Sequence, residues 1–561
     1  MKMMGSQAVM ESLVQAGVKI VFGYPGGAIM PIYDALYDYQ DKIKHVLVRH
    51  EQGAAHAAEG YARACGKPGV CFATSGPGAT NLVTGIADAM LDSVPIVCIT
   101  GQVTSALIGS DAFQEADVIG VTTPITKWNY QIIKAAEIPE VLAKAFHIAT
   151  TGRPGPVVID ITKDAQFGRL DFFYPKKVTI ASYNPNLFPH PKQIELAAEL
   201  LNNAKRPYVL FGHGVLIAKA EKELRTLIEK GGLPAAATLH GISALPADHP
   251  LYVGFLGMHG NYGPNVLSNK ADVVLAVGMR FDDRVTGRLK DYLPRAKIIH
   301  IDIDPAELNK NVKTYIPIVA DAKIALQELT QKIKKNHHRP WLAEFRKCDQ
   351  LEMTKVIKNE SYPRAGQIKM AEVITMLSEK TKGRAIIVVD VGQHQMVAAR
   401  YYKPVLADSF ITSGGMGTMG FALPAGMGAK FAAPEREVIV VCGDGGFQMN
   451  IQELATIAQE QIPLKIIILN NSYLGMVRQW QELFFNKRYS STRLQNPDFI
   501  QIAKGFYIKG EKVQDRSDLS LALSRLIKAK TPYLLEIMVE KEGNVFPMVP
   551  SGASVEEIRL E

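Results

Sequence analysis

The 561-residue sequence has few cysteines and lacks the paired spacings that would give them a structural role. Only five are present, and none forms a Cys-x-x-Cys pair. They are Cys65, Cys71, Cys98, Cys348 and Cys442. Structural zinc sites and disulfide-rich secreted folds depend on such pairs. We therefore expect a reducing compartment, with the cytoplasm as the default location, and no structural zinc.

Long apolar runs are absent as well. No stretch approaches the about 20 uninterrupted apolar residues that a membrane-spanning helix needs. The N-terminal segment carries Glu11 and a helical apolar pattern, which is not the pattern of a signal or transit peptide. The net charge of +8 is spread along the chain, and the densest basic run, at 332–339, precedes Pro340 as in a solvated linker. The sequence thus predicts no membrane and no nucleic-acid partner, and its mild positive charge suits small anionic substrates.

Short β-branched runs alternate with longer helical patterns along most of the chain. This alternation is typical of parallel sheets joined by crossover helices. Pro-rich or basic stretches at 174–193 and 332–341 interrupt it. The sequence predicts an α/β protein with three doubly wound parallel-sheet domains, at 1–170, 190–332 and 365–545.

One stretch in the last domain suggests a metal and phosphate site. VIVVCGDGGF at 438–447 has the pattern of a buried strand and a tight turn, and we expect a helix from Phe447 to Gln461. A second apolar run then ends in two asparagines. Glycines and a helix N-terminus favour phosphate, so Asp444 makes sense beside a divalent cation, with Asn471 as a second oxygen ligand.

Gly-Asp-Gly followed by Asn-Asn resembles the diphosphate-binding motif of thiamine diphosphate enzymes. The resemblance implies that Asp444 and Asn471 bind Mg²⁺ through their side chains and Tyr473 through its backbone carbonyl. It also implies that the glycines of the turn contact the cofactor. These are Gly443, Gly445 and Gly446.

In the first domain, the stretch HVLVRHEQGAAHAAEGYARA carries Glu51 between an apolar run and an Ala-rich helix. Taken alone, Glu51 fits an acid at a helix N-terminus, where it complements the helix dipole. The resemblance makes it the catalytic glutamate that activates the aminopyrimidine ring of the cofactor. In that family the pyrimidine lies on the first domain of one subunit and the diphosphate on the third domain of another, so a homodimer is the minimum unit implied.

Motifs along most of the chain closely resemble the catalytic subunits of acetohydroxyacid synthase, also called acetolactate synthase. They include FGYPGGAIMPIYDAL, RHEQGAAHAAEGYARA, GMRFDDRVTG, TSGGMGTMGFALPAG and NNSYLGMVRQWQE. The family decarboxylates pyruvate and joins the two-carbon unit to pyruvate or 2-oxobutyrate, on the way to valine, leucine and isoleucine. The resemblance also implies a homodimer or homotetramer and a separate small regulatory subunit.

Residues of the substrate site follow from the same resemblance. Arg280 could be a simple ion-pair partner of Asp282 or Asp283, but in the family it holds the acceptor's carboxylate. Trp480 could pack in a core, but in the family it lines the acceptor pocket and favours 2-oxobutyrate. Further residues implied to reach the substrate or the active site are Phe113, Gln114, Lys163 and Met258.

Further cofactor contacts are implied around two loops of the last domain. Taken alone, His394 could be an ordinary hydrogen-bonded histidine, and Met419 and Met476 could be gap fillers. The resemblance places Met419 under the cofactor and Met476 beside the substrate. The implied contacts are Gly392, Gln393, His394, Gly417, Met419 and Met476.

The middle domain suggests a dinucleotide site, although G-x-G-x-x-G is absent. FGHGV and LGMHG place glycines after apolar runs, and IIHIDID ends a run in acids. The resemblance implies bound FAD with a structural role. Its implied contacts are Arg153, Gly212, Gly214, Thr238, Leu239, Gly257, His259, Arg280, Asp302, Ile303 and Asp321.

Other functions compete with this interpretation. A flavin-independent catabolic acetolactate synthase would share most of the motifs, and a flavin-dependent pyruvate oxidase would share the three domains. RFDDRVTG and GQHQM, together with Trp480, favour the biosynthetic enzyme. A binding module without catalysis should have lost Glu51, Asp444 or Asn471, and all three are present.

Overall fold

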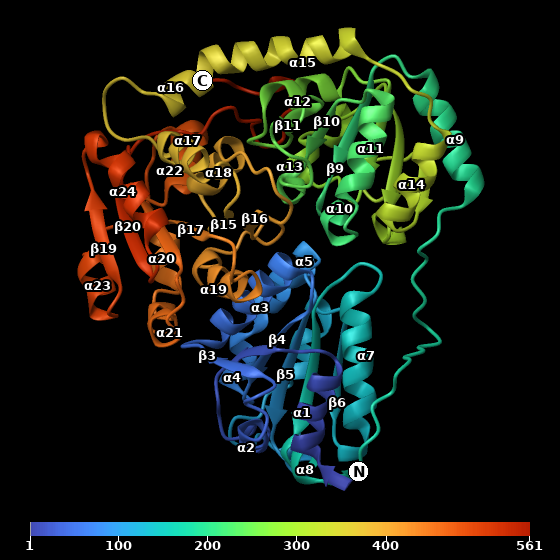
Figure 1. Cartoon of the computed structure of the whole chain (residues 1–561), viewed down its shortest axis with the longest axis vertical. Helices are drawn as coiled ribbons and strands as arrows, with labels where there is room; N and C mark the ends of the chain where they lie inside the picture. Colours follow the sequence, from blue (N-terminus) through green and yellow to red (C-terminus); the bar gives the residue numbers. More distant parts are fainter. Residues whose placement is uncertain (1) are drawn as a thin grey trace.

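The computed structural model describes residues 2–561 and contains three six-stranded parallel sheets in successive parts of the chain (Figure 1). Parallel neighbours need long crossover connections, and the helical segments between the strands supply them. A small antiparallel pair, β1 (Lys2–Met4) with β8 (Arg169–Asp171), is the fourth sheet. The predicted α/β class is confirmed.

The first sheet, in the lower part of Figure 1, has the order β3-β2-β4-β5-β7-β6. In this order its strands are Lys44–Leu47, Ile20–Gly23, Gly69–Ala73, Ile96–Gln102, Val157–Thr162 and Trp128–Ile132. Its helices are α1 (Gly5–Gln15), α2 (Met30–Tyr37), α3 (Glu51–Cys65), α4 (Pro77–Asn81), α5 (Val83–Asp92), α6 (Val118–Thr122), α7 (Ile138–Thr150) and α8 (Lys163–Phe167). The strand order reverses direction between β2 and β4, so the loops that follow them diverge at that edge.

The middle sheet has the order β11-β10-β9-β12-β13-β14. In this order its strands are Tyr252–Phe255, Ala235–Ala237, Pro207–Phe211, Val273–Val277, Lys297–Asp302 and Ile316–Val319. Its helices are α9 (Pro191–Asn203), α10 (His213–Ile217), α11 (Glu221–Gly231), α12 (Tyr262–Ser268), α13 (Asp283–Thr286) and α14 (Ala322–Lys332). Here the order reverses between β9 and β12.

The third sheet has the order β16-β15-β17-β18-β20-β19. In this order its strands are Phe410–Thr412, Ile386–Val389, Val438–Gly443, Lys465–Asn470, Tyr533–Met538 and Lys509–Val513. Its helices are α17 (Met370–Thr381), α18 (Gln393–Tyr401), α19 (Ala422–Ala432), α20 (Asp444–Met449), α21 (Glu453–Gln459), α22 (Gly475–Phe484), α23 (Phe499–Gly505) and α24 (Arg516–Lys528). The reversal lies between β15 and β17.

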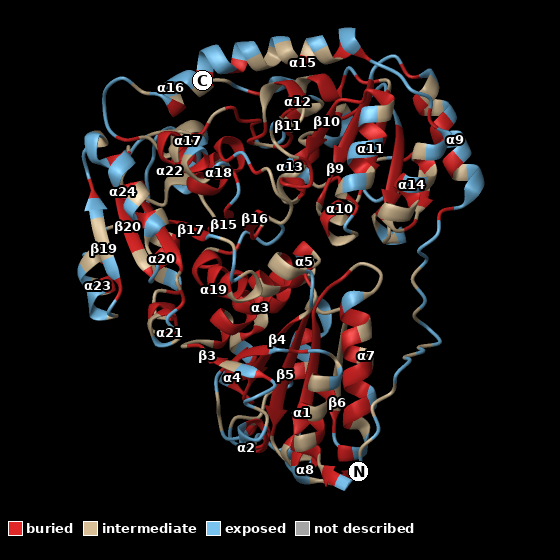
Figure 2. Cartoon of the chain, in the orientation of Figure 1, coloured by how far each residue is buried: buried red, intermediate tan, exposed pale blue. Residues whose placement is uncertain are grey.

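Two connections join these units. An extended stretch that follows β8 runs up to α9 (Figure 1). Helices α15 (Arg339–Glu352) and α16 (Lys358–Ser361) lead from the middle unit to the third, and α15 turns an exposed face outward (Figure 2). Its inner face holds Trp341, which is buried and donates its indole N–H to Pro207 O at 2.9 Å.

The central strands are buried on both faces (Figure 2). Every residue of β17 and of β18 is buried. Strands covered by helices on both sides carry continuous apolar runs rather than alternating ones, which explains the appearance of VIVV and KIIIL in the sequence.

Helix α3 of the first unit packs closely against α19 of the third. A β-carbon added at Gly60 would overlap the backbone of Ala425, and one added at Gly428 would overlap the backbone of Ala57. Glycine permits this approach because it has no β-carbon. The first and third units therefore share one apolar core, which includes residues of both helices.

Among residues 2–561, no helix combines the length and the apolar character needed to cross a bilayer.

We predict that Gly60→Ala lowers the stability of the chain by about 1–3 kcal/mol, because overpacking a filled interface forces backbone shifts. A lower melting temperature in thermal unfolding would show this. Gly505→Ala is the matched control, since a β-carbon there meets nothing within 4 Å. Equal melting temperatures for the two variants would contradict the close contact between α3 and α19.

Candidate active site

The two strands of the Asp444 site lie side by side, and both end at the same edge. β17 and β18 are parallel, with Gly443 paired to Leu469. Asp444 and Asn471 therefore follow neighbouring strand ends. The turn after β15, which leads into α18 at Gln393, lies on the other side of β17. This is the reversal point of the sheet, where open α/β sheets bind their ligands.

The carboxyl group of Asp444 is almost fully buried, with 1% of the residue exposed. Asn496 Nδ2 donates to Asp444 Oδ2 at 2.6 Å and to Asn470 Oδ1 at 3.0 Å. Burial raises the pKa of Asp444 to about 6, and the groups that oppose this rise are Asn496 and backbone N–H groups rather than a cation. A buried carboxylate without a cationic partner fits a metal ligand, because a divalent cation would compensate its charge.

Asn471 and Tyr473 complete the turn after β18. Tyr473 N donates to Asn471 Oδ1 at 3.1 Å, while Asn471 Nδ2 lies 3.4 Å from Gln393 Oε1. The turn is thereby tied to the loop after β15. Amide and carbonyl oxygens of this kind suit Mg²⁺.

A small pocket at this edge is lined by most of the predicted cofactor contacts. Glycine is favoured at Gly392, which has a φ of +150°, and a β-carbon at Gly445 would press on the side chain of Leu474, at 2.9 Å from its Cδ2. His394 Nε2 accepts a hydrogen bond from Gly443 N at 3.1 Å, so this histidine braces the turn. The predicted residues that line the pocket are Gly392, Gln393, His394, Met419, Gly443, Asp444, Gly445, Gly446, Asn471, Tyr473 and Met476.

The helix expected from Phe447 to Gln461 is wrong as a single element. α20 begins earlier, at Asp444, and ends at Met449, and α21 follows at Glu453–Gln459. Asn450 leaves the helical conformation, with φ −131° and ψ 29°, and its Nδ2 donates to Gly420 O at 2.8 Å. The hydrogen bond to Gly420, in another loop, therefore ends a helix that the local sequence pattern predicts to continue.

A cavity of about 1400 Å³ lies between the three units and adjoins this pocket. Gly392, Gly417, Met419 and Met476 line it from the third unit. The middle unit supplies most of the predicted flavin contacts. The predicted residues that line the cavity there are Gly214, Thr238, Leu239, Gly257, Met258, His259, Arg280, Asp302, Ile303 and Asp321, together with Arg153 from the first unit.

Gly212 does not line the cavity. A β-carbon at Gly212 would lie 2.5 Å from Gly278 O, so this glycine allows the loops after β9 and β12 to approach. Asp321 caps α14, since its Oδ1 accepts from Lys323 N at 2.9 Å and from Ile324 N at 3.2 Å. Within this single chain, Gly212 and Asp321 therefore both have structural roles.

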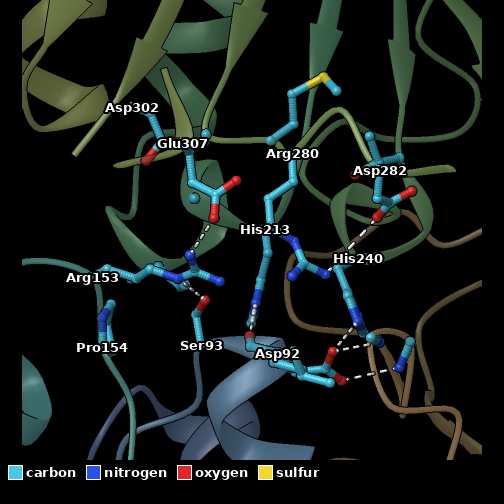
Figure 3. A pocket seen from close by; sticks show the side chains of 18 of the residues that line it. Asp92, Ser93, Arg153, Pro154, His213, His240, Arg280, Asp282, Asp302 and Glu307 are labelled. Atoms are coloured by element: carbon cyan, nitrogen blue, oxygen red, sulfur yellow. Dashed lines mark hydrogen bonds and ion pairs between the residues drawn. The ribbon is translucent and has the colours of Figure 1, made fainter. Parts of the chain in front are cut away.

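Charged and polar groups face the cavity near the middle sheet (Figure 3). Arg153 Nη1 contacts Glu307 Oε1 at 2.8 Å and Asp304 Oδ2 at 3.2 Å, and its Nε donates to Ser93 Oγ at 2.9 Å. Burial raises the pKa of Asp302 to about 7. His259 is 4% exposed, and neither ring nitrogen has a hydrogen-bond partner. Such orphaned polar atoms at a large cavity fit a polar ligand.

Arg280 and Trp480 line the same cavity from different units. Arg280 follows β12, and its Nη2 lies 3.9 Å from Asp282 Oδ2. Trp480 lies on α22 and is 36% exposed, so core packing does not account for it. A guanidinium group and an indole thus share one space, which suits a small carboxylate with an alkyl end.

Glu51 and Gln114 both lie against the segment that follows β4 in the first unit. Glu51 begins α3, is 8% exposed and accepts from Asn81 Nδ2 at 2.9 Å. A β-carbon at Gly78 would lie 3.3 Å from Glu51 Oε1, and one at Gly76 would lie 2.9 Å from Gln114 O. The segment that follows β4 therefore separates the two residues.

Four predicted residues of the first unit line neither cavity: Glu51, Phe113, Gln114 and Lys163. Phe113 is 88% exposed, and Lys163 begins α8. One chain therefore assembles the Asp444 site and the large cavity, but it does not bring these four side chains to them.

The sequence analysis did not predict two polar residues of the site. Asn496 lies in a segment without a motif, so its bonds to Asp444 and Asn470 could not be anticipated. Gln479, fully buried on α22, accepts from Gln393 Nε2 and Val545 N, both at 2.9 Å. The one sequence signal that could have indicated Gln479 was its position next to Trp480.

Three family models of thiamine pyrophosphate enzymes match successive parts of the chain. The N-terminal TPP binding domain matches residues 3–121, the central domain residues 194–329, and the C-terminal TPP binding domain residues 390–537. Each match falls on one of the three sheets, and β6, β7 and β15 lie outside the matched residues.

Curated relatives are similar from end to end. A probable acetolactate synthase large subunit from Methanocaldococcus jannaschii is 46% identical, covering 100% of this chain and 96% of its own. The acetolactate synthase isozyme 2 large subunit of Escherichia coli K12 is 46% identical over 99% of both chains. An acetolactate synthase of Mycobacterium bovis is 45% identical over 99% of this chain and 91% of its own.

We expect Asn496→Ala to weaken Mg²⁺ binding about 10- to 100-fold, the usual cost of losing a group that orients a metal ligand. Titration calorimetry with Mg²⁺, in the presence of thiamine diphosphate, measures this. Gln452→Ala is a suitable control, since Gln452 Nε2 donates to Asn450 Oδ1 rather than to the Asp444 site. Unchanged Mg²⁺ affinity in Asn496→Ala would show that Asn496 does not orient the metal ligand.

Proposed function

This chain belongs to the thiamine pyrophosphate enzymes, and among them to the acetolactate synthase large subunits. On this premise we propose a role for each residue of the site. It is a thiamine diphosphate-dependent carboligase of branched-chain amino acid biosynthesis. It decarboxylates pyruvate and condenses the two-carbon unit with a second 2-oxoacid. Pyruvate as acceptor gives 2-acetolactate, and 2-oxobutyrate gives 2-aceto-2-hydroxybutyrate.

The observation that carries the proposal is the shared cavity of Arg280 and Trp480. A guanidinium group binds a carboxylate with directional hydrogen bonds. The indole supplies an apolar wall for the alkyl end of the acceptor. Pyruvate and 2-oxobutyrate differ by one methylene, and a shaped apolar wall can turn this difference into about 1–3 kcal/mol of preference.

Thiamine diphosphate, when bound, supplies the acidic thiazolium carbon and the electron sink that decarboxylation of a 2-oxoacid requires. Asp444 and Asn471 would hold Mg²⁺, with the backbone carbonyl of Tyr473. The glycine turns after β15 and β17 would let the backbone approach the diphosphate. Asn496 would keep the Asp444 carboxylate oriented, which its 2.6 Å hydrogen bond supports.

Glu51 would hold the proton of the pyrimidine ring nitrogen. Its burial, and its single amide donor Asn81, support this role because one carboxylate oxygen stays available. Gln114 and Lys163 would act at the same edge of the first unit, and Phe113 would reach the substrate.

FAD would occupy the middle of the large cavity. The cavity volume, the acids and arginine around Asp302, and the orphaned ring of His259 support a dinucleotide there. This favours the flavin-dependent biosynthetic enzyme over a flavin-independent one. Carboligation needs no net electron transfer, so a structural role for the flavin is sufficient.

The subunit organisation is part of the proposal. Glu51 and the Asp444 site do not meet in one chain, which supports a homodimer or homotetramer whose sites combine two chains. The relatives named as large subunits support a separate small regulatory subunit. The cysteine composition supports a cytoplasmic compartment.

A product assay tests the function. Purified protein receives Mg²⁺, thiamine diphosphate, FAD, and equal pyruvate and 2-oxobutyrate, and both acetohydroxyacids are quantified. We expect mainly 2-aceto-2-hydroxybutyrate, and we expect Trp480→Leu to reduce that preference about 10-fold or more while pyruvate consumption changes little. Acetate formed with a reduced electron acceptor, instead of acetohydroxyacids, would refute the carboligase.

Glu51→Gln should lower turnover about 10²- to 10⁴-fold, the typical contribution of a positioned proton-transfer group. Mg²⁺ affinity should stay the same, because Asp444 belongs to another unit. Glu59→Gln is the matched control, being a buried acid of the same helix whose carboxylate contacts His56 at 2.8 Å. Comparable losses in both variants would show a structural effect of α3 rather than activation by Glu51.

A further inference from the structure

A buried ion pair joins helix α15 to the third unit. Arg400 lies on α18, near its C-terminal end, and Glu352 is the last residue of α15, which runs between the middle and third units (Figure 1). Arg400 is 3% exposed and Glu352 is 1% exposed, and Arg400 Nη2 donates to Glu352 Oε1. Because both groups are shielded from water, each charge depends on the other for compensation.

Arg400 also binds the loop that follows β11, at 256–261. Its Nη1 donates to Gly260 O at 2.9 Å and to His259 O at 3.3 Å. Among residues 2–561, no other hydrogen bond is made to these two carbonyl oxygens. Hydrogen bonds from a charged donor are stronger than those between neutral groups. A residue of the third unit therefore fixes the backbone of this loop in the middle unit.

Glu352 holds the same loop at its far end, where α12 begins. Its Oε1 accepts from Asn261 Nδ2 at 3.0 Å, and its Oε2 accepts from Tyr262 N at 2.6 Å. Both carboxylate oxygens are therefore occupied, one of them by the loop and by Arg400 together. The ion pair thus reaches four consecutive residues, 259–262, through hydrogen bonds.

The loop held in this way faces the large cavity. Gly257, Met258 and His259 line the cavity, whereas Arg400 and Glu352 do not. The ion pair therefore lies behind the loop, on the side away from the cavity lining. The backbone that Arg400 holds is the backbone that presents these three residues to the cavity.

Helix α18 also borders the diphosphate pocket. It begins at Gln393, and both Gln393 and His394 line the Asp444 pocket. Arg400 lies about two helical turns further along. One helix thus carries pocket residues at its start and binds the loop at 256–261 near its end, so it sets the distance between the two.

We propose that Arg400, paired with Glu352, is a positioning residue for the flavin: it holds the loop at 256–261 so that Met258 and His259 face the bound FAD. This inference rests on the proposed function, in which FAD occupies the large cavity. Glu352 compensates the charge of Arg400 and binds the end of the loop. Neither side chain lines the cavity, so both act through the loop.

The double variant Arg400→Met/Glu352→Gln tests the proposal. Removing one partner alone would leave the other as an unpaired buried charge, whereas replacing both with uncharged groups of similar size is often neutral for stability. The carbonyl groups of His259 and Gly260 then lose their donor. We expect the Kd for FAD, measured by the change in flavin fluorescence on titration into full-length protein freed of flavin, to rise about 10- to 100-fold. The Kd for thiamine diphosphate with Mg²⁺ should stay within about twofold of wild type, because the Asp444 pocket lies at the other end of α18.

Two further variants separate positioning from folding. Asn261→Ala removes a hydrogen bond between the loop and Glu352 but leaves the ion pair intact, so it should fold and should raise the Kd for FAD about 3- to 10-fold. Arg436→Met is the matched control, since Arg436 Nη1 donates to Ala407 O at 3.2 Å within the third unit, and it should leave FAD binding unchanged. Melting temperatures without FAD are recorded for each variant.

An unchanged Kd for FAD in the folded double variant would overturn the proposal, and so would an unchanged Kd in Asn261→Ala if the double variant does not fold. Equal losses of affinity for FAD and for thiamine diphosphate would also overturn it, because a general loosening of the fold would explain both. If the wild-type protein binds no FAD, the proposed flavin site itself fails, and this result is obtained before any variant is compared.

Discussion

The contact between α3 and α19 is the constraint on which the arrangement of the first and third units depends. Gly60 and Gly428 let the two helix backbones meet without intervening side chains. Because Glu51 begins α3, this contact also fixes where the carboxyl edge of the first sheet lies. The same arrangement places Asp92, at the end of the neighbouring α5, where it accepts hydrogen bonds from the loop at 414–415. Packing of small residues in one core thus determines the position of polar groups at its border.

The three sheets place their functional loops by the same rule. In each sheet the strand order reverses next to a central strand, and the loops that follow the two flanking strands separate there. The loops after β15 and β17 form the Asp444 pocket, and those after β9 and β12 border the large cavity. Glycine occurs in these loops where backbone must approach backbone, as at Gly212 and Gly278.

What could be predicted from the sequence is what local pattern controls. Strands buried on both faces appear as apolar runs, so β17 and β18 were visible, and with them Asp444 and Asn471. The interruption of the helix at Asn450 was not visible, because it depends on Gly420 from a distant loop. Asn496 and the pairing of Arg400 with Glu352 were hidden for the same reason: each depends on residues far apart in the chain, and no spacing marks them.

The separation of Glu51 from the Asp444 pocket has a physical consequence for assembly. α3 is covered by α19 of its own chain, and Glu453 of α21 accepts from Arg49 N at 3.0 Å and from His50 N at 3.1 Å next to Glu51. The third unit of the same chain therefore contacts the start of α3, but Glu51 does not line the Asp444 pocket. Phe113, beside Gln114, is 88% exposed, and like Phe173 and Tyr507 it is a single large apolar side chain on the surface, which is common. A second copy that presents its Asp444 pocket to this edge would cover Phe113 and supply the missing half of the site in one step. In the proposed homodimer, a site that needs both Glu51 and the Asp444 pocket would therefore draw them from two chains.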